Sequence, residues 1–522
     1  MSIPREYFLG DLLSRSARKF PNKTSVVFGD KRLTYQEVDD RANAIANSLI
    51  RMGVKRGDRV GLLADNTYEW IEMYFAPAKA SATFVPLNTT AVPREMEFVL
   101  NYVSPKVLIL QPRFLDMIQS MKSRLSSIES YVVMSADAPG MENYERLIQE
   151  NSKEEPVVEI DPLDIGLIIF TGGTTGMPRG AMHTHRGMIF NVHSMAIGLK
   201  QNYNDVEMHV TPIYHTAMAS QIMCSTFLGN KHVIVPKFEA VKVLELITEE
   251  RVTCGFVVPT IVNMLLQVPD LEKHDLSSLR ALYYGGAPMP IKLLEQALKR
   301  IPSGFIQFYG QTEGFLMAVL PPEDHVVEGP SEKVKKSRAA GTALVNYELK
   351  VVDDEDRDVP VGEVGEIVAK GPTVMAGYWD RPEETAEAMR GGWLHTGDLA
   401  WMDEDGYLYI VERKKDMIIS GGKNIYCPEV EEVLYRHPDV LEATVFGVPD
   451  DHWGESVKAA VALKPGKELT EEELIQYCTE NLAGYKKPNS VDFLKELPKS
   501  PAGKILKRVL RDKYWANKEK KI

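Results

Sequence analysis

The segment Phe170-Thr171-Gly172-Gly173-Thr174-Thr175-Gly176-Met177-Pro178-Arg179-Gly180 is the most informative stretch of this 522-residue chain. It directly follows the β-branched run 165–170, which predicts a strand. Glycines allow tight turns of positive φ with inward-facing N–H groups, and the threonine hydroxyls and Arg179 add donors for phosphate oxygens. We therefore predict a phosphate-binding loop, with a plain structural turn as the alternative. The Gly-x-x-x-x-Gly-Lys-Ser/Thr pattern is absent from the chain, which disfavours a P-loop kinase or ATPase.

Short apolar runs alternate with amphipathic helical patterns on both sides of this segment. The runs 59–63, 107–110 and 232–235 predict further strands, each between helices. Such alternation is typical of a layered α/β architecture. From 348 to 370 the pattern becomes strand, acidic turn and strand, which predicts a small β-rich subdomain within a large multi-sheet N-terminal domain.

A charged segment, 412–416, marks the expected domain boundary, because it follows a short strand and precedes a glycine pair. The prediction is an N-terminal domain over 1–412 and a small, mobile α+β lid over 413–522. In the lid, helices are expected at 428–436 and 470–481, and strands at 442–446 and 458–463, before a basic end.

The composition excludes several classes of protein. Its 44% apolar and 26% charged residues are globular averages, and the length calls for at least two domains. The 61 basic against 73 acidic residues give a net charge of −12, which argues against nucleic acid as a partner. Four separated cysteines indicate neither a disulfide scaffold nor a zinc site. With no export signal and no apolar run near the roughly 20 residues of a membrane span, we expect a cytoplasmic protein without a transmembrane segment.

Two further glycine-containing segments carry chemistry. In 307–314, Tyr309 can cover a purine face, Thr312 can bond a phosphate, and Glu313 can hold Mg²⁺, which prefers one or two carboxylates plus phosphate oxygens. In 391–399, the carboxylate of Asp398 can accept both hydroxyls of a ribose. A capped strand end and a structural turn are the respective alternatives.

Taken with Tyr284-Gly285-Gly286-Ala287-Pro288, these segments resemble, in order, the signature motifs of the adenylate-forming superfamily of acyl- and aryl-CoA synthetases, peptide-synthetase adenylation domains and beetle luciferases. The similarity extends from Leu33-Thr34-Tyr35 to Pro501-Ala502-Gly503-Lys504. It implies an acid–thiol ligase that uses ATP, Mg²⁺ and coenzyme A, forms an acyl-adenylate, and releases AMP when the thioester forms.

The resemblance also implies individual roles. Lys504 reaches between the acid and the α-phosphate, Thr312 binds that phosphate, Glu313 holds the metal, and His215 acts as a pocket or gate residue, against the alternative of a core histidine. Lys415 is the hinge of the lid. The full set of expected nucleotide and coenzyme A contacts is Thr171, Gly172, Gly173, Thr174, Thr175, Gly176, Arg179, Gly285, Gly286, Ala287, Pro288, Tyr309, Gly310, Gln311, Thr312, Asp398, Arg413, Lys415, Gly421, Gly422 and Lys423.

Four residues depart from the family pattern. Gly172 stands where serine is usual and Arg179 where lysine is usual, so one hydroxyl is missing and the cation is a planar fork. Lys423 replaces an acid and Cys427 replaces a proline. Lys423 either meets the phosphates of coenzyme A or is a solvated surface lysine. Because the expected chemistry needs no protein nucleophile, we assign all four cysteines to packing.

The acid is expected to be medium-sized, apolar and monocarboxylic: fatty, alicyclic or aromatic. Relatives specific for acetate close the pocket with a tryptophan where this chain has Gly310, and the stretches 215–219 and 315–317 supply apolar walls without a second basic group. The partners are then the acid, ATP and coenzyme A, and a homodimer is compatible with the sequence. A stand-alone adenylation enzyme, a luciferase-like oxidase and a non-catalytic nucleotide-binding protein are the alternatives.

Overall fold

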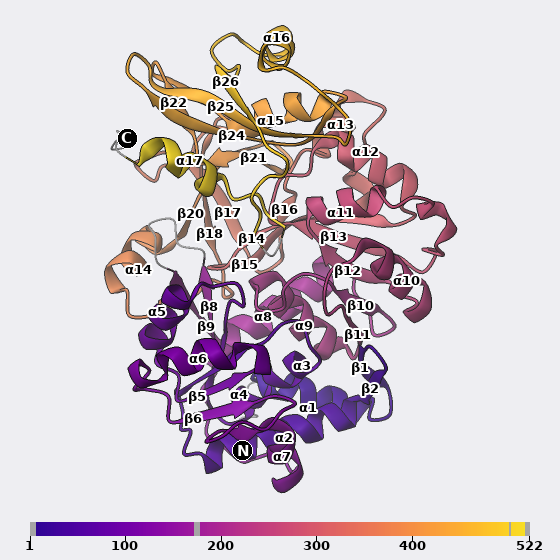
Figure 1. The fold of residues 1–522 in the computed structure, drawn as a ribbon, viewed down its shortest axis with the longest axis vertical. Helices are drawn as coiled ribbons and strands as arrows, with labels where there is room; N and C mark the ends of the chain where they lie inside the picture. Colours follow the sequence, from indigo (N-terminus) through magenta and orange to yellow (C-terminus); the bar gives the residue numbers. More distant parts are fainter. Residues whose placement is uncertain (1–6, 172–177, 501–502, 517–522) are drawn as a thin grey trace.

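The computed structural model describes residues 7–171, 178–500 and 503–516. These residues form a large N-terminal domain of three sheets and a smaller C-terminal unit, which Figure 1 shows stacked at one end of the long axis, in yellow. We call this C-terminal unit, with its own sheet and three helices, the lid. The expected fold class, layered α/β with a β-rich subdomain and a small α+β lid, is confirmed.

The two large sheets are mixed, with parallel strands at their centres. One has the order β19 (Gly377–Tyr378), β9 (Arg179–Thr184), β8 (Ile165–Thr171), β4 (Thr83–Pro86), β3 (Arg59–Leu63), β5 (Val107–Leu110), β6 (Ser130–Val133), β7 (Glu142–Asn143). The other has the order β16 (Thr342–Ala343), β15 (Phe315–Leu320), β14 (Gly304–Gln311), β13 (Ala281–Gly285), β12 (Cys254–Val257), β10 (Val206–His209), β11 (Lys231–Ile234), β1 (Thr24–Phe28), β2 (Lys31–Thr34).

The two small sheets lie towards the C-terminus. The antiparallel subdomain sheet contains β17 (Glu348–Val352), β18 (Gly365–Lys370), β20 (Leu394–Met402) and β21 (Leu408–Arg413). The lid sheet contains β23 (Lys423–Ile425), β22 (Ile418–Ser420), β25 (Gly454–Leu463), β24 (Val440–Asp450) and β26 (Ser490–Phe493). The predicted domain boundary after residue 412 therefore falls at the last residue of β21.

The α-helices cover these sheets. They are α1 (Leu9–Lys19), α2 (Tyr35–Arg51), α3 (Glu69–Met73), α4 (Ala76–Lys79), α5 (Pro93–Val103), α6 (Leu115–Met121), α7 (Tyr144–Glu150), α8 (His185–Gly198), α9 (Thr216–Leu228), α10 (Ala240–Glu250), α11 (Pro259–Leu266), α12 (Ile291–Arg300), α13 (Ser331–Lys336), α14 (Pro382–Ala388), α15 (Cys427–Arg436), α16 (Glu471–Asn481) and α17 (Lys507–Trp515). Among the described residues, none of them is long and apolar enough to cross a membrane.

Local sequence explains where key elements begin and end. Thr34 starts α2 with a reciprocal cap, since its side chain accepts from the Glu37 backbone while the Glu37 carboxylate accepts from the Thr34 N–H at 2.7 Å. Gly229 ends α9 in the left-handed region, at φ +77°. Strands β12 and β13 are buried along their whole length, as expected for central parallel strands covered on both faces.

Helices α8 and α9 join the two large sheets. Helix α8 packs against β8 and β9 of one sheet and β15 of the other, while α9 contacts β11, β12 and β15. Both helices are consequently buried on most sides, and their sequences show little amphipathic contrast. The first residue before α9, His215, thus lies where the edges of the two sheets approach each other.

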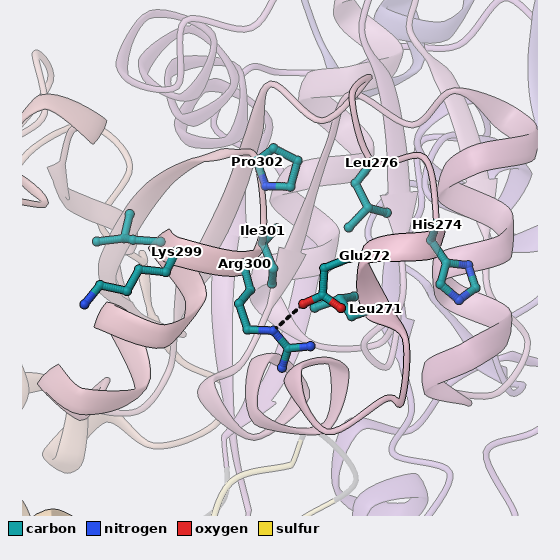
Figure 2. A pocket seen from close by; sticks show the side chains of 9 residues that line it. Leu271, Glu272, His274, Leu276, Lys299, Arg300, Ile301 and Pro302 are labelled. Carbon is teal, nitrogen blue, oxygen red and sulfur yellow. Dashed lines mark hydrogen bonds and ion pairs between the residues drawn. The ribbon is translucent and has the colours of Figure 1, made fainter.

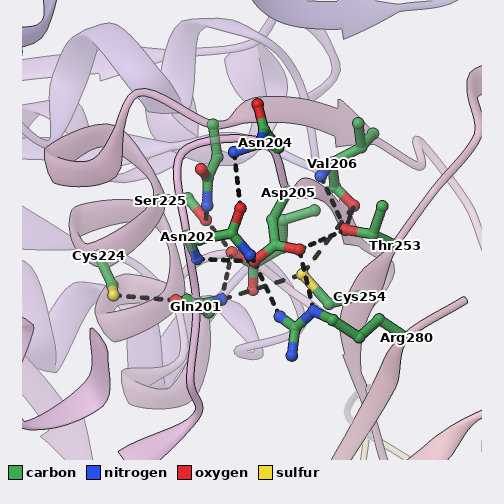
Figure 3. A network of polar contacts seen from close by, with 12 residues as sticks. Gln201, Asn202, Asn204, Asp205, Val206, Cys224, Ser225, Thr253, Cys254 and Arg280 are labelled. Atoms are coloured by element: carbon green, nitrogen blue, oxygen red, sulfur yellow. Dashed lines mark hydrogen bonds and ion pairs between the residues drawn. The ribbon is translucent and has the colours of Figure 1, made fainter. Parts of the chain in front are cut away.

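A buried polar network lies at the amino ends of β10, β12 and β13 (Figure 3). Asp205 accepts from Thr253 Oγ1 at 2.9 Å and from Arg280 Nη2 at 2.8 Å. Nearby, Cys224 Sγ donates to Gln201 Oε1 at 2.9 Å, and Cys254 is also buried. All four cysteines of the chain are free and buried, which agrees with a packing role.

The lid has hydrophobic cores of its own. One buried cluster joins α15 and α16 to the inner face of the lid sheet, and a second, around Phe446 and Leu510, joins the other face to α17. Neither cluster includes a residue of the N-terminal sheets. A unit with separate cores can keep its structure when its position relative to the rest of the chain changes.

Candidate active site

The glycine-rich segment connects β8 to β9. Gly172, Gly173, Thr174, Thr175 and Gly176 lie outside the described residues, but both flanks are described. The hydroxyl of Thr171 and the Nε of Arg179 are buried and, within residues 7–171, 178–500 and 503–516, lack a hydrogen-bond partner. Buried polar atoms of this kind normally bond a ligand or water. These two atoms therefore fit an oxygen-rich group such as a phosphate at the end of β8.

Thr312 and Glu313 occupy the tight turn between β14 and β15. Thr312 is held from two sides: its carbonyl oxygen lies 2.9 Å from His183 Nε2, and its hydroxyl accepts from Thr216 Oγ1 at 3.1 Å. Burial lowers the pKa of His183 to about 3, so its ring is neutral and Nε2 carries the donated proton. The turn is thereby fixed to both β9 and α9.

Glu313 is only 8% exposed, and Tyr378 Oη donates to its Oε1 at 2.7 Å. The guanidinium of Arg179 lies 4.5 Å from the centre of the Tyr378 ring and 3.3 Å from the Glu384 carboxylate. Within the described part of the chain, no group of three or more His, Cys, Asp or Glu side chains could hold a metal ion. A Mg²⁺ ion at Glu313 would therefore take its remaining ligands from phosphate oxygens and water, as this ion commonly does.

Asp398 and Arg413 are direct cross-strand partners in β20 and β21. Their side chains form an ion pair of 3.1 Å, and Tyr309 Oη donates to the other Asp398 oxygen at 3.0 Å. Burial, then the charge of Asp398, raises the pKa of Tyr309 well above its ordinary value, so the phenol keeps its proton and remains a donor. The structure thus brings together three residues that the sequence placed in separate motifs.

The glycines around β13 and β14 lie close to neighbouring backbone. A Cβ on Gly285 would come within 2.6 Å of the Phe308 carbonyl oxygen, and one on Gly310 would overlap the carbonyl oxygen of Phe315. Gly310 sits at an irregularity in the pairing of β14 with β15, and the carbonyl of Gln311 accepts from Gly314 N at 3.2 Å. No side chain fits at position 310 in this backbone.

The residues after β13 open towards solvent. Gly286 has φ +74° and free space on its Cβ side, Ala287 is half-buried, and Pro288 is exposed. Because nothing covers this short stretch from the Cβ side of Gly286, a flat ligand has room to lie against its backbone. This geometry agrees with the adenine-lining role that the resemblance implies for the three residues.

His215 is the residue before the first turn of α9, and its ring packs on Tyr214 at 4.5 Å. Its Nε2 is buried and lacks a partner among the described residues, and burial lowers the pKa of the imidazole to about 4. The ring is therefore neutral at physiological pH and offers one nitrogen for hydrogen bonding. The two predicted apolar walls meet beside it, since Met218 and Met317 belong to one buried cluster.

Lys504 lies in the lid, on the loop before α17. The residue is exposed to solvent, yet protein surrounds its ammonium group; this desolvation, followed by repulsion from Arg413, lowers the pKa of the Lys504 ammonium to about 8. Asp398 of the N-terminal domain also acts on this charge. The lysine therefore shares the cleft with the Asp398–Arg413 pair.

Lys415 occupies a turn between β21 and the lid sheet. Immediately before it, the buried carboxylate of Glu412 accepts from the backbone N–H of Arg413 and of Cys427, each at 2.8 Å. Proline has no N–H, so the proline that relatives carry in place of Cys427 could not form the second bond. This departure from the family pattern thus adds a tie between β21 and α15.

Gly421 and Gly422 form the two-residue turn of the β22–β23 hairpin, with φ of +56° and +76°. A turn of this kind needs positive φ at both positions, which explains the glycine pair locally. A Cβ on Gly421 would also lie 2.6 Å from the Trp453 ring. Lys423 is exposed, with its ammonium 4.5 Å from the centre of the Tyr485 ring, so these three residues are described only against other lid residues.

The most open pocket lies elsewhere, between the short 3₁₀ helix Leu271–Lys273 and the end of α12 (Figure 2). Its volume is about 430 Å³, and Arg300 pairs with Glu272 across it at 2.7 Å. None of the expected site residues lines it. We assign the active site to the cleft under the lid, because the orphaned donors and the buried carboxylates gather there.

Sequence reasoning missed several residues that hold the site. Tyr378, Thr216 and His183 orient Glu313 and Thr312, and Thr260 of α11 contacts the lysine loop through its hydroxyl, 3.0 Å from the Gly503 carbonyl oxygen. Tyrosine, threonine and histidine are frequent in ordinary cores and helix ends, so their spacing along the chain carried no signal. Only their positions in space identify them.

Comparison with known proteins agrees with this geometry. The family model described as AMP-binding enzyme matches residues 13–379, and the one described as AMP-binding enzyme C-terminal domain matches residues 429–504. A feruloyl-CoA synthase of an Amycolatopsis species is 37% identical over 98% of this chain and all of its own length. A long-chain-fatty-acid–CoA ligase of Mycobacterium tuberculosis is 36% identical over 93% of this chain and 94% of its own.

Among solved structures, the anthranilate CoA ligase AuaEII in complex with anthranoyl-AMP superimposes with a TM-score of 0.90. The two sequences are 30% identical, and the match covers 98% of each chain. The likeness therefore spans the N-terminal sheets and the lid together.

Proposed function

We propose, from the premise that this chain belongs to the AMP-binding enzyme family, that it converts an apolar carboxylic acid into an acyl-adenylate and then into a coenzyme A thioester. It is thus an AMP-forming acid–CoA ligase. The observation that carries this function is the convergence of Lys504 with the Tyr309–Asp398–Arg413 cluster at one cleft.

In the first step, a carboxylate oxygen of the acid attacks the α-phosphorus of ATP, the bond to pyrophosphate breaks, and pyrophosphate leaves. Two anions must approach each other, so positioning and positive charge supply most of the rate. We assign the ribose to Asp398 and Arg413, the α-phosphate to Thr312, and the stabilisation of both reacting oxygens to Lys504. The fixed turn at Thr312 and the partly desolvated ammonium of Lys504 support these assignments.

We assign the metal to Glu313. Mg²⁺, when bound, neutralises charge on the phosphate oxygens as pyrophosphate departs. The Tyr378 hydrogen bond orients the Glu313 carboxylate before any ion arrives. His215, neutral and with one free nitrogen, suits a hydrogen bond at the mouth of the acyl site.

In the second step, the thiol sulfur of coenzyme A attacks the acyl carbon, the bond to AMP breaks, and the thiol proton is released. The sulfur needs the space that pyrophosphate and Lys504 occupied, so the lid, over 413–522, is proposed to rotate about Lys415. The separate cores of the lid support this motion. Gly421, Gly422 and Lys423 are then proposed to border the coenzyme A site.

The preferred acid is proposed to be of medium size, fatty, alicyclic or aromatic. Met218 and Met317 supply an apolar wall, and the aromatic and fatty acids in the relatives' names support this range. The backbone at Gly310 excludes any side chain, so a tryptophan that shortens the pocket has no room there. Four free cysteines support a reducing compartment such as the cytoplasm.

The test is pyrophosphate exchange into ATP with a panel of acids, followed by AMP release with and without coenzyme A. Exchange with apolar acids and coenzyme A-dependent AMP release are expected. Exchange without any thioester would indicate a stand-alone adenylation enzyme or an oxidase instead. A lack of exchange with every acid would indicate a nucleotide-binding protein without catalysis.

A further inference from the structure

The loop that carries Lys504 is fastened to the N-terminal domain next to the lysine itself. Thr260, in the first turn of α11, donates its hydroxyl to the carbonyl oxygen of Gly503 at 3.0 Å. Gly503 directly precedes Lys504, so this bond fixes the peptide from which the lysine side chain departs. The two residues are 243 positions apart in the chain and belong to different domains.

Within the lid, the loop is already tied together. The Ser500 N–H donates to the Lys504 carbonyl at 2.7 Å, the Gly503 N–H donates to the Ser500 carbonyl at 2.8 Å, and Ser500 Oγ accepts from Lys504 N at 3.2 Å. These bonds join lid residues to one another and persist wherever the lid lies. The loop therefore moves as one piece, and Thr260 acts on that piece from outside.

Gly503 permits the close approach. Its φ is +79°, and a Cβ there would lie 2.5 Å from Thr260 Oγ1 and 3.0 Å from Val258 Cγ2. Any side chain would push the loop off α11. The contact is thus both a hydrogen bond and a steric fit, which a chance approach of two surfaces rarely provides.

Other bonds between the lid and the N-terminal domain involve α15 and not the lysine loop. Arg338 pairs with Glu432 at 3.0 Å, and Lys292 donates to the Arg436 carbonyl at 3.5 Å. Their side chains are partly or well exposed, and exposed ion pairs of this kind contribute little. The position of Lys504 therefore depends most directly on the Thr260 contact.

We propose that Thr260 is a positioning residue for adenylation: it latches the Lys504 loop onto α11 during the first half-reaction and releases it for the second. The proposal rests on the two-step function given above. Because the contact exists only with the lid in the present orientation, it biases the lid towards adenylation. Losing it shifts the equilibrium towards the orientation needed for thioester formation.

The matched variants are Thr260→Val, which keeps the shape but removes the donor, and Thr260→Ser, which keeps the donor. Thr260→Val is expected to slow acyl-adenylate formation about fivefold, equivalent to about 1 kcal/mol. The rate of thioester formation from preformed acyl-adenylate should stay unchanged or rise. Thr260→Ser should restore adenylation to near the wild-type rate. A purely structural defect would slow both half-reactions.

A second experiment tests the steric fit. Gly503→Ala is expected to reduce adenylation at least tenfold, through backbone strain plus the clash with Thr260. In a Thr260→Ala background the clash is smaller, so the same Gly503→Ala change should cost less, and the double-mutant cycle should show coupling. Strictly additive losses would mean that the two residues do not touch in the working enzyme.

The outcomes separate the latch from the proposed function. If the wild-type chain performs both half-reactions while Thr260→Val leaves adenylation unchanged or slows both steps equally, the latch is wrong and the ligase function stands. If the wild-type chain shows no acid-dependent exchange, the function itself is wrong. Equal thermal unfolding of the Thr260 variants and the wild type controls for misfolding.

Discussion

Asp398 and Lys504 face the same cleft, but the protein holds them in different ways. Asp398 is 5% exposed, lies within a strand, and is bonded on one oxygen by Arg413 and on the other by Tyr309. Lys504 is exposed, lies on a loop, and is fastened to the N-terminal domain through one hydrogen bond at the neighbouring residue. The nucleotide half of the site is built to stay, and the lysine half is built to leave.

This difference matches the chemistry. Both half-reactions need AMP to be held, whereas only the first needs a cation at the site of pyrophosphate departure. A residue used throughout gains from preorganisation on rigid strands. A residue used once must be released at little cost, which a single hydrogen bond of about 1 kcal/mol allows. Variants of the two halves should therefore affect the two half-reactions differently.

The largest expected effect is that of Lys504→Ala. Adenylation should slow about a hundredfold or more, because the charge that stabilises the reacting oxygens is lost, while thioester formation from preformed acyl-adenylate should be spared. Rapid-quench assays of each half-reaction give the two rates. Lys495→Ala, at an exposed lid position, is the control. Equal losses in both steps would remove the contrast between the two halves.

Asp398→Asn should come next. Asparagine keeps a similar shape beside Tyr309 but loses the charge that pairs with Arg413. Hydrogen bonds to charged groups are worth about 1.5–3 kcal/mol, so we expect KM for ATP to rise about thirtyfold. Both half-reactions should suffer, in contrast to Lys504→Ala. Nucleotide affinity can be measured by calorimetry, and an unchanged affinity would contradict the ribose assignment.

The pH dependence of adenylation should report Lys504. Its pKa is lowered to about 8, so the ammonium is charged at lower pH and loses its proton as pH rises through that value. We expect kcat/KM for adenylation by the free enzyme to fall about tenfold per pH unit above this point. Thioester formation should lack this limb. In Lys504→Arg the limb should move to higher pH, because guanidinium stays charged.

The smallest effect concerns stability. Glu207, in the network of Figure 3, has its pKa raised by burial from 4.5 to about 8. Between these values the unfolded chain has lost the proton that the folded chain keeps, so stability falls as pH rises from 4.5 to 8.

Glu207→Gln should remove this dependence from the N-terminal domain and leave the lid unaffected. The measurement is thermal unfolding at pH 5 and pH 8, where the wild type should lose about 2 °C or more relative to the variant. An identical pH dependence in both proteins would show that Glu207 ionises normally in the fold.

Much of the fold and of the site could be predicted from the sequence. The runs at 59–63, 107–110 and 165–170 correspond to β3, β5 and β8, and the helices expected at 428–436 and 470–481 correspond to α15 and α16. Local patterning decides such elements, because period and capping act within a few residues. Asp398 was predicted as a ribose ligand, yet it lies inside strand β20 and not in a turn.

The sequence alone therefore determined the family, the layered α/β class and the residues that carry the adenylating chemistry, since each motif is a short run with its own glycines and functional groups. The tertiary structure alone decided which of them meet: Tyr309 with Asp398, Glu412 with Cys427, and Thr260 with Gly503. It also decided the shifted pKa values of Lys504 and Glu207. The reason is physical, because hydrogen bonding and desolvation depend on distances in space between groups that the chain keeps far apart.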